Sequence, residues 1–255
     1  MNRVALTLTL TATLVLPAVA EAQGGPGFLF KRPKVSIGIR TGYSVPRAES
    51  DLFQDAFQQF KLNDWDMASP YLGGELAIGV SERWDVALTG GWARSRSVSE
   101  YREFIECTVA VTPCPAQNQL PINQTTTFQT VSTTVGGRYY FGDRGRSIGR
   151  FAWVPSRLTP FVGAGVGYTW YDFMQRGDFV DFQTLEIVGD ELRTDGSGAT
   201  AYAAAGADLS VGKQFYLTGE ARYVVANGGV RGEYSGYDGI DLSGLQVTAG
   251  ISLRW

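Results

Sequence analysis

Strict alternation of apolar and polar residues is the feature that most limits what this chain can fold into. The pattern is clearest over residues 245–255, where Leu, Val, Ala, Ile, Leu and Trp take every second position and Gln, Thr, Gly, Ser and Arg take the positions between them. A period of two indicates a β-strand with one apolar and one polar face. A terminal segment of this kind predicts a sheet protein rather than a helical one.

The same alternation recurs in seven earlier segments. The predicted strands are 34–44, 71–80, 84–98, 122–141, 159–173, 199–211 and 215–226, followed by 245–255. An even number of strands places both termini on the same side of a closed barrel. Strands of about ten residues that are apolar on one face have the length needed to cross a membrane. We therefore predict an all-β fold, an eight-stranded antiparallel transmembrane up-and-down β-barrel.

The connections between the predicted strands differ in length. Those after the second and sixth strands, 81–83 and 212–214, are short, whereas those after the first, third, fifth and seventh strands are long. Short periplasmic turns and long extracellular loops give this asymmetry in outer-membrane barrels. One connection does not fit, because 142–157 falls where a short turn is expected. It is long and contains Arg144, Arg146, Arg150 and Arg157, and the sequence gives no reason for its length.

The first residues have the composition of an export signal. A short basic start at Asn2 and Arg3 is followed by an apolar stretch and by small residues that fit cleavage after Ala20 or Ala22. The expected organisation is a signal peptide at 1–22, an N-terminal periplasmic segment at 23–33 and an outer-membrane barrel at 34–255. The formal net charge of −3 argues against a nucleic-acid partner.

The chain contains no histidine. This excludes most hydrolase and zinc chemistry, and no Ser-x-x-Lys spacing supplies another base for a nucleophile. The glycines of 163–167 alternate with apolar residues, so we interpret them as inward-facing residues of a strand rather than as a phosphate-binding loop. We predict no enzymatic activity, no catalytic residues, and no cofactor or metal site.

The inward faces of the predicted strands carry charges of both signs. Four are basic and four are acidic: Arg40, Arg138, Arg222 and Arg254, and Glu75, Asp85, Asp208 and Glu220. An eight-stranded barrel is just wide enough for side chains to fill it. Charges inside it are tolerated when they are paired and hydrogen-bonded, which favours a structural network. A gate or a proton-linked pore is the alternative.

Two features are predicted in the long loops. Cys107 and Cys114 are the only cysteines, and in an exported protein such a pair predicts a disulfide, with metal binding as the weaker alternative. Residues 51–62 have helical spacing of Leu52, Phe53, Ala56 and further aromatic residues, with Ser50 as a candidate cap. This helix would pack over the barrel mouth, lie at the membrane interface, or contribute to an apolar ligand site.

Taken together, the signal peptide, the eight alternating strands and the terminal aromatic strand resemble the bacterial small outer-membrane β-barrel family of the OmpA, OmpX and OmpW type. The resemblance implies an outer-membrane location, contact with outer-membrane lipids and periplasmic termini. The terminal positions also resemble the signal that the barrel-assembly machinery reads, with Trp where the family most often has Phe. Those positions are Val247, Ala249, Ile251, Leu253 and Trp255.

Three functions follow from this reading. The favoured one is a non-enzymatic structural or surface-interaction barrel whose loops contact external partners. The resemblance to OmpW implies the second, a narrow porin-like transporter for small apolar molecules. The third is a soluble lipocalin-like carrier, which would turn its apolar residues inward. An apolar path through the lumen would favour the transporter, and a filled, ion-paired lumen would exclude it.

Overall fold

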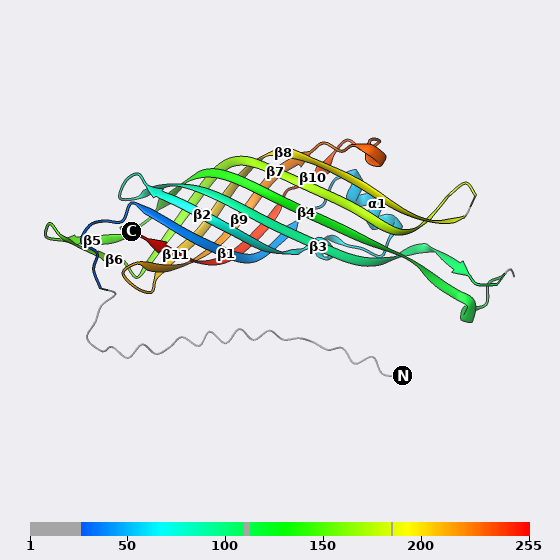
Figure 1. Cartoon of the computed structure of the whole chain (residues 1–255), viewed down its shortest axis with the longest axis horizontal. Helices are drawn as coiled ribbons and strands as arrows, with labels where there is room; N and C mark the ends of the chain where they lie inside the picture. The colour runs from blue at the N-terminus through cyan, green and yellow to red at the C-terminus, as the bar shows by residue number, and fades with distance from the viewer. Residues whose placement is uncertain (1–26, 110–112, 185) are drawn as a thin grey trace.

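A single antiparallel sheet closes on itself to form the body of the molecule (Figure 1). The computed structural model describes residues 27–109, 113–184 and 186–255, so the predicted signal peptide at 1–22 lies outside the described residues. The long strands pair in the order β1, β2, β3, β4, β7, β8, β9 and β11, and β11 returns to β1. The predicted eight-stranded antiparallel barrel is confirmed.

The strands and helices have the following bounds. The barrel strands are β1 (Val35–Pro46), β2 (Ser69–Gly79), β3 (Trp84–Cys107), β4 (Gln119–Tyr140), β7 (Leu158–Val180), β8 (Ile187–Ser210), β9 (Phe215–Gly228) and β11 (Gly244–Arg254). The short elements are β5 (Gly145–Ile148), β6 (Ala152–Pro155), β10 (Ile240–Asp241), α1 (Asp51–Gln59), and the 3-10 turns η1 (Asp64–Met67), η2 (Ala116–Asn118) and η3 (Gly232–Tyr234). Among the described residues, no helix is long and apolar enough to cross a membrane.

The alternation in the sequence places apolar side chains on the outside of the barrel. Along β1, Ile37 and Ile39 are exposed while Arg40 is buried, and the other strands repeat this pattern. Aromatic residues lie at both limits of the apolar band, with Trp84 at one and Trp92 at the other. Such girdles mark the two interfaces of a membrane barrel. A lipocalin has the opposite arrangement, so the carrier alternative is not supported.

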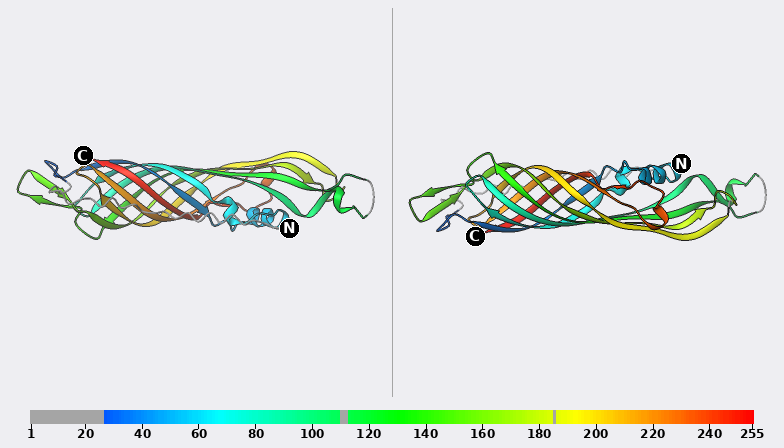
Figure 2. Two further views of the ribbon diagram at one scale, coloured as in Figure 1. Left: turned by 90° about the horizontal axis from the view of Figure 1, so that it is seen from below. Right: turned by 90° about the horizontal axis from the view of Figure 1, so that it is seen from above.

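The barrel has two unlike ends. At one end, which we call the turn end, lie residues 27–34, 80–83, 142–157 and 211–214. At the other, the loop end, β3 with β4 and β7 with β8 continue beyond the barrel as two long hairpins (Figures 1 and 2). These hairpins differ from our prediction, because β3 and β8 each contain 24 residues. Past the membrane both faces of the strands carry polar residues, so the alternation that marks a strand fades in the sequence.

The long connection 142–157 folds as a hairpin of its own. β5 pairs with β6, and Gly149 takes a positive φ of 65° in the turn between them. Leu29 forms a bridge with Trp153 on the other side of β6, with N–H to O distances of 2.9 and 2.8 Å. The extra length therefore builds a small two-stranded hairpin at the turn end, joined by one bridge to the segment before β1, which was not predicted.

Candidate functional site

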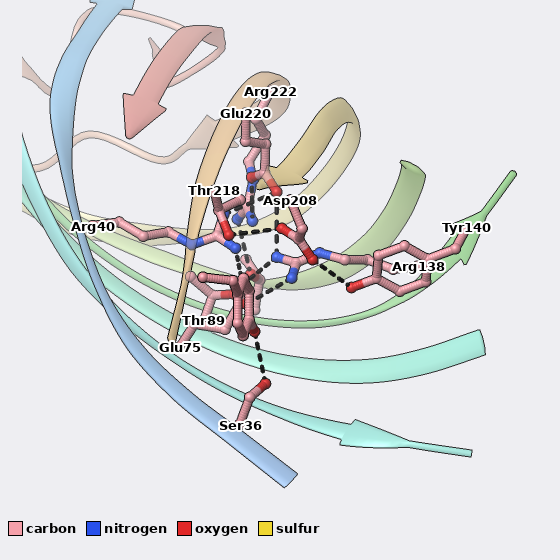
Figure 3. A network of polar contacts seen from close by, with 12 residues as sticks. Ser36, Arg40, Glu75, Thr89, Arg138, Tyr140, Asp208, Thr218, Glu220 and Arg222 are labelled. Carbon is pink, nitrogen blue, oxygen red and sulfur yellow. Dashed lines mark hydrogen bonds and ion pairs between the residues drawn. The ribbon is translucent and has the colours of Figure 1, made fainter. Parts of the chain in front are cut away.

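Five of the predicted charged residues meet across the middle of the lumen, and we call them the charge cluster (Figure 3). They are Arg40 from β1, Glu75 from β2, Arg138 from β4, and Glu220 and Arg222 from β9. All five are buried, with at most 6% of each residue exposed. Each of these residues occupies an inward-facing position of its strand, so its side chain enters the lumen. Where the side chains meet, the cluster joins strands on opposite walls of the barrel.

Each carboxylate in the charge cluster contacts more than one guanidinium. Glu75 forms an ion pair with Arg40 at 2.7 Å and accepts a hydrogen bond from Arg138 at 2.6 Å. Glu220 contacts Arg40 at 2.9 Å, Arg138 at 3.2 Å and Arg222 at 2.9 Å. Shared, multidentate pairing of this kind offsets the cost of removing the charges from water.

Aromatic rings complete the filling around the charge cluster. The guanidinium carbon of Arg222 lies 4.0 Å from the centroid of the Tyr202 ring, and that of Arg138 lies 4.8 Å from the Phe161 centroid. Flat stacking on aromatic faces stabilises desolvated arginines. Gly91 faces the ring of Tyr71 so closely that a Cβ there would collide with it. The lumen is thus packed rather than open.

The other three predicted lumen charges do not join the charge cluster. Asp208 accepts hydrogen bonds from Tyr140 at 3.1 Å and Thr218 at 2.7 Å. Arg254 donates to the carbonyl oxygens of Lys213 and Gly212, each at 3.1 Å, and contacts no carboxylate among the described residues. The prediction of one eight-member network is therefore too broad, because the strands hold these residues at a level nearer the turn end.

Asp85 has a partner that the sequence did not reveal. Arg144, from the connection 142–157, places its Nη1 2.5 Å from the Asp85 carboxylate. Its guanidinium carbon also lies 4.8 Å from the Tyr140 centroid. The only signal in the sequence was a run of arginines in a connection that had no reason to be long. Arg144 enters the turn end of the lumen and helps to close it.

The space left in the lumen is small. One cavity of about 30 Å³ lies on the loop side of the charge cluster and includes Tyr71, Thr134 and Arg222 in its lining. A second of about 30 Å³ lies on the turn side, beside Asp85 and Trp153. A cavity of this size has room for roughly two water molecules.

At the loop end, α1 closes the mouth of the barrel. The ring of Phe53 is fully buried, with centroids 5.5 Å from Phe128 and 5.6 Å from Phe173. Both partners project inward from barrel strands, and Tyr234 of η3 packs on Phe173 at 5.6 Å. Of the three placements that the sequence allowed for this helix, packing over the mouth is the one found.

One detail of the helix prediction is wrong. Ser50 is the residue that precedes α1, but its side chain makes no capping hydrogen bond. Its hydroxyl is buried and has no hydrogen-bond partner among the described residues, while the Ser50 carbonyl accepts from the N–H of Gln54 at 3.0 Å. Packing of the apolar face, rather than a side-chain cap, therefore holds the start of α1 in place.

The loop that carries α1 is fastened to the loop between β9 and β11. The Tyr237 hydroxyl donates to Asp55 at 2.6 Å, and burial together with this hydrogen bond raises the pKa of Tyr237 to about 12. Arg47 donates to Asp241 at 3.0 Å. Burial opposes ionisation of Asp241, but hydrogen bonds from Ser243 and Arg47 outweigh it and lower the pKa of this carboxyl. The two loops form one cap.

The predicted disulfide is present. Cys107 and Cys114 are bonded, with their Cα atoms 5.9 Å apart, at the far end of the β3–β4 hairpin. Among the described residues there is no group of three or more side chains suited to hold a metal ion. The disulfide is therefore a covalent crosslink at the end of the β3–β4 hairpin.

No protein-family model and no curated protein sequence matches this chain. Solved structures are similar in fold. Neisserial surface protein A has 10% identity and a TM-score of 0.47 over 87% of this chain and 96% of its own. OprG from Pseudomonas aeruginosa has 13% identity and a TM-score of 0.47 over 91% of this chain and 99% of its own. Escherichia coli outer membrane protein W has 14% identity and a TM-score of 0.39 over 88% of this chain and 100% of its own.

The fold is an eight-stranded antiparallel β-barrel with an apolar outer face. The similarity concerns the architecture alone, so the activity of this barrel must be argued from its own residues. Its lumen is closed at three levels: by the cap with α1 at the loop end, by the charge cluster in the middle, and by Arg144 with Trp153 at the turn end.

Proposed function

We propose that this chain is a non-conducting outer-membrane barrel that acts through its surface, as a structural or surface-interaction protein. The observation that carries the proposal is the charge cluster, in which Arg40, Glu75, Arg138 and Glu220 span the lumen from wall to wall. A passing solute would have to break contacts between buried charges. Removing one partner from such a set costs about 3–5 kcal/mol.

The hypothesis of a transporter for small apolar molecules has less support. An apolar solute needs a continuous apolar path, yet the middle of the lumen is lined by ion pairs. The two cavities measure about 30 Å³ each, and small-molecule sites in proteins measure about 300–1,000 Å³. We retain transport as the alternative that the experiment below distinguishes.

The remaining assignments belong to the same proposal. A signal peptide at 1–22 directs export, the segment 23–33 and both termini lie in the periplasm, and the projecting hairpins face outward. The apolar outer face contacts membrane lipids, and the strand that ends in Leu253 and Trp255 is the part that the barrel-assembly machinery reads. The short turns at one end and the long hairpins at the other support this orientation.

The test is conductance of the refolded mature protein in a planar bilayer, with uptake of small polar and apolar solutes into liposomes. We expect no conductance steps and no uptake above empty liposomes. A variant with all five residues of the charge cluster changed to Ser is the matched control, since it removes every ion pair from the middle of the lumen. It is used only if its folded form resists detergent on a gel. Steady conductance or selective uptake by the unaltered protein would overturn the proposal.

A further inference from the structure

The turn end carries a strong excess of positive charge. It contains nine basic residues against two acidic ones, in a chain whose formal net charge is −3. The basic residues are Lys31, Arg32, Lys34, Arg83, Arg144, Arg146, Arg150, Arg157 and Lys213, and the acidic residues are Glu82 and Asp143. A patch of one sign on a protein of the opposite net charge selects partners by charge.

The acidic residues at the turn end are already paired. Arg32 lies 2.7 Å from Glu82, and Arg83 lies 3.5 Å from Asp143. Arg144 is paired with Asp85 inside the lumen. The six other basic residues form no ion pair within the described part of the chain: Lys31, Lys34, Arg146, Arg150, Arg157 and Lys213. Their charges are available to a partner.

The same end exposes large apolar side chains in a defined place. Trp153 of β6, which Leu29 bridges, points toward the lumen, where it lies against the guanidinium of Arg254. Strand alternation places Val154, Arg146 and Ile148 on the opposite face of the hairpin. Phe28 and Phe30, on either side of Leu29, pack edge to face with centroids 5.6 Å apart. Phe30 is 76% exposed and Ile148 is 52% exposed. Phe151, in the turn after Arg150, is 72% exposed.

The outer edge of β5 also offers backbone groups. Trp153 uses its N–H and C=O on Leu29. Ser147, which lies opposite Trp153 in the β5–β6 pair, must therefore direct its own N–H and C=O away from β6. No strand covers that edge among the described residues. Free backbone groups at a sheet edge accept an extended peptide as an added strand.

We propose that this aromatic and basic face of the β5–β6 hairpin is a docking surface for an extended acidic peptide segment of a periplasmic protein. Arginine and lysine pair with its carboxylates, the exposed rings cover its apolar side chains, and the β5 edge binds its backbone. The hairpin projects beyond the other turns, along the barrel axis (Figure 1). This position holds the face clear of the lipid-facing girdle around Trp84, which favours a soluble partner over lipid headgroups.

The inference goes beyond a non-conducting barrel and relies only on the assignment of the turn end to the periplasm.

The barrel is placed in nanodiscs of zwitterionic lipid, and binding of a labelled peptide of alternating Glu and Val is measured by fluorescence anisotropy. A peptide of alternating Lys and Val is the reverse-charge probe. We expect saturable binding of the acidic peptide alone, weakened by added salt.

Two double variants locate the site. Arg146→Glu with Arg150→Glu should weaken binding at least about ten-fold, because two attractive contacts become repulsive. Arg94→Glu with Arg96→Glu makes the same change of charge at the loop end and should leave binding unchanged. Phe30→Ser with Phe151→Ser should weaken binding without any change of charge.

Several results would overturn the inference. They are equal losses in the turn-end and loop-end charge variants, binding of both peptides alike, or no binding of the acidic peptide. Binding only to vesicles that contain phosphatidylglycerol would assign the face to lipid instead. A conducting barrel that still binds the acidic peptide at Arg146 and Arg150 would overturn the proposed function while leaving this inference standing.

Discussion

Glu220 is the residue on which the closed lumen depends most, because it contacts three arginines at once. Without it, Arg40 and Arg138 keep Glu75, but Arg222 keeps no carboxylate among the described residues. We predict that Glu220→Ala lowers the unfolding free energy by about 3–5 kcal/mol, since a buried guanidinium is left without its partner. Thermal or urea unfolding in detergent measures the change.

Glu191→Ala is the matched control for Glu220→Ala. Glu191 is exposed and lies 3.7 Å from Arg176, also exposed, and pairs of this kind contribute about 0–1 kcal/mol. Equal effects of the two substitutions would mean that the charge cluster does not stabilise the barrel.

The sequence predicts on which face of a strand each side chain lies, but it does not predict which charged residues pair. Alternation alone placed Arg40, Glu75 and Glu220 inside, because a period of two fixes the face of each position. It could not fix the level of each charge along the barrel axis, which depends on the tilt and stagger of the strands. For that reason Asp85 and Asp208 were expected in the central network and instead lie nearer the turn end. Arg144 was not predicted because the connection 142–157 lacks the alternation of apolar and polar residues that marks a strand.

Among the elements, α1 was predictable because its apolar residues recur at helical spacing. Its partners were not, because Phe128 and Phe173 lie on strands distant in the sequence and meet the helix only in the closed barrel. The outer halves of β3 and β8 were not predictable for a different reason. Beyond the membrane neither face is uniformly apolar, so the alternation ends before the strand does.

The loop helix and the charge cluster share no residues, so we expect each to close the lumen independently. We predict that Phe53→Ala loosens the cap, because it removes a fully buried ring at a cost of about 3–5 kcal/mol. The variant should be cleaved faster by protease within residues 47–68, yet it should remain non-conducting because the charge cluster is intact. Trp65→Ala, at a position that is 75% exposed, is the control. Conductance of Phe53→Ala would show that the cap alone closes the pore.

At the scale of the whole molecule, charge is divided between the two ends. The loop-end segments 47–68, 94–130, 172–197 and 227–243 contain eighteen acidic and eight basic residues, whereas the turn end has nine basic and two acidic residues. The charges inside the lumen balance. A barrel of this kind presents surfaces of opposite sign to the two sides of a membrane, so charge alone would favour different partners at the two ends. This is consistent with a protein whose function lies at its surfaces rather than in a pore.

The barrel exists as a closed body only because its last strand returns to its first. β11 pairs with β1 from Arg254 with Ser36 through Gly244 with Pro46, and Trp255 extends the seam. Its N–H donates to the Val35 carbonyl at 3.0 Å, and its carbonyl accepts from the N–H of Lys34 at 3.0 Å. Its side chain is 54% exposed, at the level of the turn-end girdle. These backbone hydrogen bonds do not depend on the side chain at position 255, so the indole is available for a role in assembly.

We therefore predict that Trp255→Ser slows insertion into the outer membrane several-fold while changing the stability of the inserted barrel little. Pulse-chase labelling, with the gel shift of the folded form as readout, measures the rate. Trp255→Phe should restore it, because Phe keeps the terminal aromatic ring. Phe215→Ser is the control, since it removes another exposed girdle ring from the same end. If Trp255→Ser and Phe215→Ser slow insertion equally, the ring acts as an interface anchor, and the last strand is not a specific assembly signal.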